Sequence, residues 1–101
     1  MLAPETLVVQ ALERFPEVER VILFGSRARG DGGARADIDV AVACPAADNI
    51  RWFDIIDAVE DAPTLLEIDL VRLEEVPAEL AANILREGRV LYERDQRLTA
   101  P

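Results

Sequence analysis

Two acidic residues, Asp37 and Asp39, stand two positions apart at the start of a predicted strand. Side chains two residues apart leave the same face of a strand, about 7 Å apart along the chain. Carboxylates are unfavourable in strands and repel each other at this spacing, so positive charge is needed close by. Mg²⁺, a hard ion held by one or two carboxylates and by substrate phosphates, would supply it. The pair therefore indicates a magnesium site that acts on a phosphate compound.

Asp69 is the third acidic candidate. It lies in a later predicted strand between Ile68 and Leu70, whose side chains point to the opposite face. If this strand lies beside the one that carries Asp37 and Asp39, about 4.8 Å away, the three carboxylates can share metal. They could then hold two ions, one that lowers the pKa of an attacking hydroxyl and one that holds a triphosphate and its leaving group. Taken singly, Asp69 could be an exposed edge-strand residue, and an Asp-x-Asp pair is more often an ordinary strand end or loop.

A Gly-Ser pair, Gly25 and Ser26, follows the apolar run at positions 21–24. Glycine lets the backbone approach a phosphate, serine offers a hydroxyl, and the start of a following helix presents unpaired N–H groups. Arg29, one helical turn after Ser26, could pair with a phosphate oxygen, whereas Arg27 points elsewhere on such a helix. Alone, a Gly-Ser pair after a strand is usually just a turn.

The residue types that are missing exclude several kinds of enzyme. The chain has no histidine, and all 11 of its basic residues are arginine. Without lysine there is no Walker-type phosphate loop and no Schiff-base chemistry. Without histidine, Ser26 cannot belong to a Ser-His-Asp triad, and no metal can be bound through imidazole. Carboxylates, arginines and backbone amides must therefore carry any chemistry.

The net charge of -9 argues against direct, sequence-independent binding of nucleic acid. It favours a basic partner surface, a metal, or both, although excess acid also simply aids solubility. One cysteine, Cys44, excludes an internal disulfide and fits the reducing cytoplasm; we expect it to be a small core residue. No apolar run approaches the roughly 20 residues that span a bilayer, so we expect no membrane association.

Hydrophobic periodicity predicts the elements that must position these residues. The pattern predicts a mixed sheet of three to four strands with helices mainly on one face, an α/β (α+β) fold. We expect one domain over residues 1–101 with its core at about 18–92. The sheet face that carries Asp37, Asp39, Glu67 and Asp69, followed by Ala41 and Ala43, is expected to be open. The expected helices are Pro4 to Phe15, Arg27 to Arg29, Asn49 to Glu60 (capped by Asp48 or Asn49) and Pro77 to about Gly88. The expected strands are Arg20 to Phe24, Asp37 to Cys44, Leu66 to Leu73 and Val90 to Tyr92. We also expect a glycine-rich loop through Gly30, Gly32 and Gly33 and a loose tail from Arg94.

Three segments together resemble the minimal nucleotidyltransferase (MNT) family of the DNA polymerase β superfamily. They read G-S-R-A-R-G from Gly25, D-I-D from Asp37 and E-I-D-L-V from Glu67. The resemblance covers positions 18–92 and implies a polymerase β-like nucleotidyltransferase core. It implies that Gly25 and Ser26 hold a nucleoside triphosphate, that Asp37 and Asp39 bind Mg²⁺ and that Asp69 is the third carboxylate. It implies, less securely, a phosphate contact for Arg29.

The family resemblance also implies a partner. Minimal nucleotidyltransferases resemble antitoxins of HEPN-type ribonuclease toxins, and some transfer AMP onto a tyrosine of the toxin. The main hypothesis is therefore a Mg²⁺-dependent enzyme that transfers AMP from ATP, or another nucleoside triphosphate, to a hydroxyl of a HEPN-type partner, in a homo- or hetero-oligomer. The alternatives are a non-catalytic antitoxin that covers its partner, and a catalytic subunit that modifies a small molecule.

Overall fold

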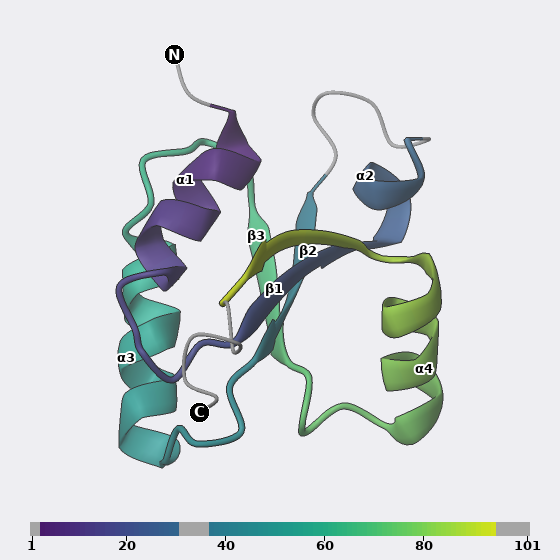
Figure 1. The fold of residues 1–101 in the computed structure, drawn as a ribbon. Coiled ribbons are helices and arrows are strands. Elements are labelled where there is room, and N and C mark those ends of the chain that lie inside the picture. The colour runs from purple at the N-terminus through teal and green to yellow at the C-terminus, as the bar shows by residue number, and fades with distance from the viewer. Residues whose placement is uncertain (1–2, 31–36, 95–101) are drawn as a thin grey trace.

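A four-stranded sheet forms the centre of the computed structural model, which describes residues 3–30 and 37–94. Its strands are β1 (Arg20–Phe24), β2 (Ile38–Ala43), β3 (Ile68–Arg72) and β4 (Arg89–Glu93). They lie in the order β3-β2-β1-β4 (Figure 1). β1 pairs antiparallel with β2 and with β4, whereas β2 pairs parallel with β3. The predicted mixed sheet is therefore confirmed.

Helices cover both faces of this sheet. They are α1 (Pro4–Leu12), α2 (Gly25–Arg29), α3 (Asn49–Glu60) and α4 (Ala78–Glu87). Figure 1 shows α1 and α3 together on one side of the sheet and α4 on the other. Two long helices thus share one face, as expected, while α4 covers part of the face that was expected to be open.

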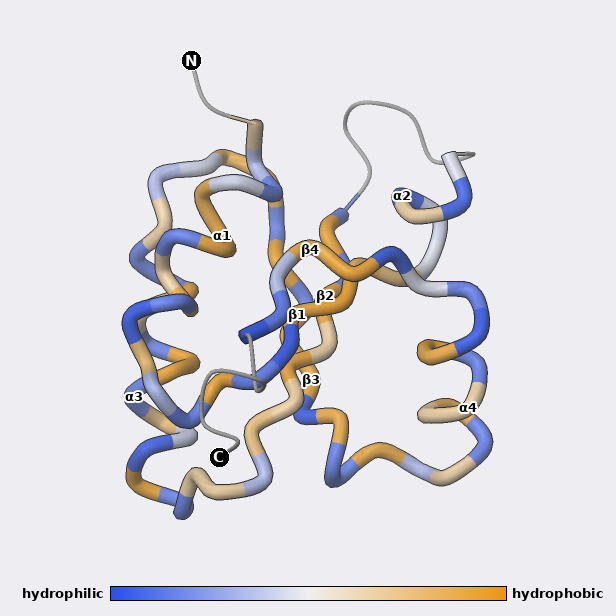
Figure 2. The backbone as a smooth tube through the Cα atoms, viewed as in Figure 1, coloured by the Kyte–Doolittle hydropathy of each residue, from blue (hydrophilic) through white to orange (hydrophobic). Residues whose placement is uncertain are grey.

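The apolar run of β1 explains why both faces are covered. Val21 and Leu23 point into the larger core, to which α1 and α3 contribute. Ile22, between them, packs with Ala41 and Ile84 in a second, smaller core under α4. The strands of the sheet accordingly carry much of the hydrophobic colour in Figure 2. A strand that is apolar on both faces needs a cover on each.

The expectation of an open face is wrong at its centre. Ala41 is fully buried and Ala43 nearly so. The small side chain of Ala41 lets α4 come close to the sheet, where Ile84 fills the space above Ala41 and Ile22. The acidic end of the same face lies beyond this second core.

Local signals set most element boundaries. β1 and α3 have their predicted bounds, and α3 is capped by Asp48, whose carboxylate accepts the Arg51 N–H at 2.8 Å. α1 ends at Leu12, earlier than predicted, and Phe15 then packs against the larger core. Gly88 follows α4 as predicted, although its φ of -74° is not left-handed.

Some predictions fall outside the described residues. Gly30 is described and adopts a left-handed conformation after α2, with φ of 82°. The rest of the predicted glycine loop, with Gly32 and Gly33, and the tail after Arg94 lie outside the described ranges. Within residues 3–30 and 37–94, no helix combines the length and apolar character that crossing a membrane requires.

Candidate active site

Asp39 and Asp69 lie directly opposite each other on neighbouring strands. The parallel register of β2 and β3 pairs Asp39 with Asp69, as Ile38 pairs with Ile68. Paired residues point to the same face of a sheet, so the two carboxyl groups are neighbours on that face. The sequence predicted that these two acids would be neighbours if their strands were adjacent. The strands are adjacent, and the two acids are neighbours.

The surroundings of Asp39 disfavour its charged form. The pKa of Asp39 is raised above its ordinary value of 3.8 by burial and then by the charge and hydrogen bond of Asp69. The charge of Asp37 raises it further, and the charge of Arg29 acts in the opposite direction. Two neighbouring carboxyl groups present the hard oxygen donors that a divalent cation prefers, so the donor set fits Mg²⁺.

Asp37 lies at the edge of this pair. It precedes β2, which begins one residue later than predicted, and its side chain is exposed. It acts electrostatically on Asp39, but no three Asp, Glu, Cys or His side chains in the described ranges form a group that could hold one metal ion. The structure thus brings Asp39 and Asp69 together and leaves Asp37 beside them. The ligand role of all three remains a prediction.

The Gly-Ser turn meets the acidic pair through Gly25. Gly25 follows Phe24, which pairs with Asp39 in the antiparallel register of β1 and β2. Its φ is +75°, and a Cβ added to it would collide with the carboxylate of Asp39. Only glycine combines that conformation with that approach. Ser26, half-buried, comes next in α2, so the expected phosphate turn and carboxylates are close neighbours.

The two arginines of α2 differ in their surroundings. Arg27 donates its Nε–H to Glu5 of α1 at 2.7 Å, and both side chains are largely buried. This contact joins α2 to α1, in agreement with the expectation that Arg27 points away from the phosphate that Arg29 could contact. Arg29 is exposed and lowers the pKa of Asp39, which puts its charge within reach of the acidic pair. Its contact with a phosphate remains a prediction.

Sequence reasoning overlooked Arg72, which organises the other end of the strands. Its guanidinium is buried and donates to the carbonyl oxygens of Cys44 at 2.8 Å and Ala47 at 2.6 Å. It also lies over the ring of Trp52. The signal was present in the sequence, because an arginine directly after four strand residues that include Leu70 and Val71 must find polar partners if it is buried.

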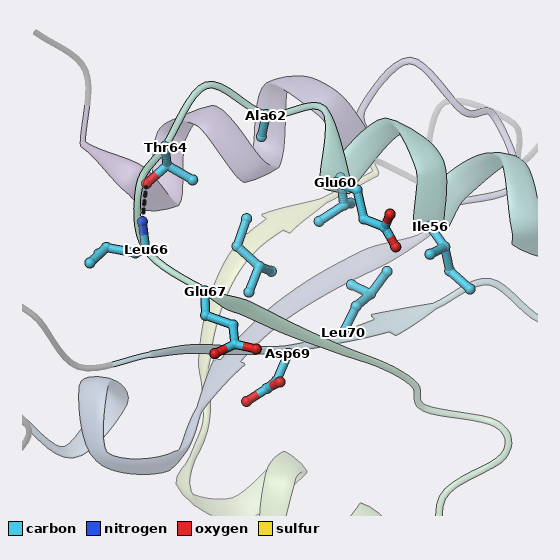
Figure 3. A pocket seen from close by; sticks show the side chains of 10 residues that line it. Ile56, Glu60, Ala62, Thr64, Leu66, Glu67, Asp69 and Leu70 are labelled. Atoms are coloured by element: carbon cyan, nitrogen blue, oxygen red, sulfur yellow. Dashed lines mark hydrogen bonds between the residues drawn. The ribbon is translucent and has the colours of Figure 1, made fainter.

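A hollow of about 450 Å³ between α3 and β3 includes Glu67 and Asp69 in its lining, although their carboxylates point away from α3. Its described lining includes Ile56 and Leu70 and contains no basic side chain. Figure 3 shows the carboxylates of Glu67 and Asp69 extending from β3 on the side away from α3. The carboxylate of Asp69 therefore lies on the side of the sheet away from α3.

Comparison with known proteins gives one family. Residues 7–97 match the family model described as "Polymerase beta, Nucleotidyltransferase". No curated protein sequence matches the chain.

Solved structures resemble the whole fold. A toxin–antitoxin structure with AMP-PNP is 26% identical, covering 92% of this chain and 76% of that chain, with a TM-score of 0.72. A mutant of the toxin–antitoxin MntA-HpeT is 25% identical, covering 92% and 75%, with a TM-score of 0.68. The tri-AMPylated Shewanella oneidensis HEPN toxin in complex with MNT antitoxin is 24% identical, covering 95% and 75%, with a TM-score of 0.66. At that identity the third likeness shows the fold alone.

Proposed function

Because the chain belongs to the polymerase β nucleotidyltransferase family, we propose that it transfers AMP from ATP to a hydroxyl of a HEPN-type toxin and acts as its antitoxin. The observation that carries this proposal is the opposition of Asp39 and Asp69 beside Gly25. It puts two neighbouring carboxyl groups next to the Gly-Ser turn, whose glycine and hydroxyl suit a phosphate.

In the proposed reaction the partner's hydroxyl oxygen attacks the α-phosphorus of ATP. A new O–P bond forms between the hydroxyl oxygen and the α-phosphorus, the bond from that phosphorus to the bridging oxygen breaks, pyrophosphate leaves, and the hydroxyl proton passes to the solvent. Gly25 gives the phosphates room, the Ser26 hydroxyl donates to a phosphate oxygen, and Arg29 offsets phosphate charge. Asp39 and Asp69, with Asp37 beside them, would hold Mg²⁺, which lowers the pKa of an attacking hydroxyl and neutralises phosphate charge.

Charge and similarity support the choice of partner and nucleotide. The net charge of -9 suits a basic partner surface. The 26% identical relative is a toxin–antitoxin crystallised with AMP-PNP, an analogue of ATP. The partner would supply the acceptor hydroxyl and much of its orientation. Correct orientation of two reactants can lower a reaction barrier by several kcal/mol, with an upper limit of roughly 7–11 kcal/mol.

Labelling tests this proposal. The chain, ATP labelled at the α-phosphate, Mg²⁺ and the protein encoded beside its gene are incubated together, with Asp39→Asn as the inactive control. Label on the partner with the natural chain and none with the variant supports AMP transfer. A tight complex without label would show a non-catalytic antitoxin, and efficient labelling of a small hydroxyl compound by the chain alone would show a small-molecule enzyme.

A further inference from the structure

A hollow of about 200 Å³ lies where the end of β1 and the start of α2 face α4. Its lining is Phe24, Gly25, Arg29, Leu80, Asn83, Ile84 and Glu87. Phe24 shares its sheet face with Asp39, because the two residues are paired in the register of β1 and β2. The hollow therefore opens next to the proposed phosphate turn, on the acidic face of the sheet.

The size of the hollow restricts what it can hold. Pockets for whole drug-sized ligands run to about 300–1,000 Å³, so about 200 Å³ suits one ring system rather than a complete nucleotide. Since Gly25 belongs both to this lining and to the proposed triphosphate site, the ring system would belong to the same ligand.

The lining has the chemistry of a base subsite. Phe24, Leu80 and Ile84 provide an apolar surface for the flat faces of a base. Asn83 provides an amide, and the amide of asparagine pairs with the N6 and N7 edge of adenine, to which guanine presents O6 instead. The amide oxygen of Asn83 accepts a hydrogen bond from Arg86 on the same helix and has a second lone pair left for an N6 amino group.

We infer that this hollow binds the base of the donor nucleotide, and that Asn83 sets a preference for adenine over guanine. The inference rests on the proposed function, because it takes the triphosphate to lie at Gly25 and Ser26. Leu80 forms the outer apolar wall of this base site.

The test compares ATP with inorganic tripolyphosphate, which has the phosphates but no base. Both are titrated with Mg²⁺ into the chain and followed by NMR. In Leu80→Trp, which fills the hollow, ATP affinity should fall about tenfold or more, while tripolyphosphate affinity stays unchanged. Leu85→Trp is the matched control: Leu85 lies on the same helix, is 53% exposed and is not part of the lining, so both affinities should stay as in the natural chain.

The Asn83→Leu variant tests the preference for adenine. The ratio of ATP to GTP affinity should fall about tenfold toward one, again with tripolyphosphate binding unchanged. Circular dichroism establishes that each variant is folded; Leu80 and Asn83 are exposed enough to tolerate the changes.

Failure of the inference differs from failure of the proposed function. If the natural chain binds ATP or labels its partner and Leu80→Trp does so equally well, the base lies elsewhere and the inference is overturned alone. If the natural chain binds neither ATP nor tripolyphosphate, both the inference and the proposed function are overturned.

Discussion

The backbone of Gly25 lies so close to the carboxylate of Asp39 that no side chain fits between them. The approach arises because Phe24, just before Gly25, is the antiparallel partner of Asp39. The positive φ of Gly25 then turns the chain from β1 into α2 beside that carboxylate. The turn and the acidic pair are thus one unit of structure.

The first prediction concerns this close approach. Gly25→Ala should abolish or strongly reduce AMP transfer, because the methyl group displaces the Asp39 carboxylate. It should also cost stability, about 1–2 kcal/mol from the left-handed backbone and more from the collision. Urea unfolding and the labelling assay measure the two effects.

Gly30→Ala is the matched control for this variant. Gly30 has a similar φ of +82°, but a Cβ there would meet nothing within 4 Å. It should lose only the backbone contribution to stability and keep its activity. If the two variants behave alike, the contact between Gly25 and Asp39 has no functional role.

The second prediction follows from the raised pKa of Asp39. The folded state holds the Asp39 proton more tightly than the unfolded chain, so the free energy of unfolding falls as pH rises from 3.8 through the raised pKa. Asp39→Asn removes this titration. Without metal, the variant should be as stable as the natural chain or slightly more stable at neutral pH, and the difference should shrink in acid. Urea unfolding across this pH range measures how the free energy of unfolding changes with pH. A natural chain that becomes more stable relative to the variant as pH rises through this range would contradict the prediction.

The third prediction concerns the partner of Asp39. Asp69→Asn should abolish transfer and weaken binding of Mg²⁺·ATP, while the fold survives because one of two repelling carboxylates is removed. Glu67→Gln is the control, since its carboxylate leaves the same side of β3 but has no partner in the register of β2 and β3. Calorimetry that finds undiminished Mg²⁺·ATP binding in Asp69→Asn would remove this residue from the site.

The fourth prediction separates the phosphate turn from the acidic pair. Loss of the Ser26 hydroxyl should weaken nucleotide binding or transfer by about 1–3 kcal/mol, the typical worth of a hydrogen bond to a charged group. Ser26→Ala should therefore be impaired but measurable in a steady-state assay. Thr6→Ala, which removes an exposed hydroxyl from α1, should have no effect. Equal rates for both variants would make the Gly-Ser turn purely structural.

The fifth prediction concerns the acceptor and the partner. Tyr92, the chain's single tyrosine, pairs with Val21 and packs against the larger core, on the sheet face opposite to Asp39. Tyr92→Phe should therefore leave transfer to the partner unchanged. The complex with a basic partner should weaken as salt increases, because charge attraction is screened. Labelling measures transfer by Tyr92→Phe, and binding at several salt concentrations measures the stability of the complex. Loss of labelling in Tyr92→Phe would contradict the prediction, because it would show that transfer requires the Tyr92 hydroxyl.

The sequence alone determined the features that depend on neighbouring residues. The bounds of β1 and α3 follow from an apolar run in one case and from the Asp48 cap and helical periodicity in the other. The alternation around Asp69 sent its side chain to the face opposite Ile68 and Leu70. The candidate residues Gly25, Ser26, Asp37, Asp39 and Asp69 could also be chosen from residue type and spacing, since each chemistry requires particular groups.

Only the tertiary structure decided which of these groups meet. The parallel pairing of β2 with β3 set Asp39 against Asp69, and that choice depends on which strand lies at which edge. The burial of Ala41 under Ile84 and the contact of Gly25 with Asp39 are likewise contacts between distant segments. Such contacts are fixed by the packing of whole elements rather than by local propensity, so spacing in the sequence could suggest them only on condition of a particular strand order.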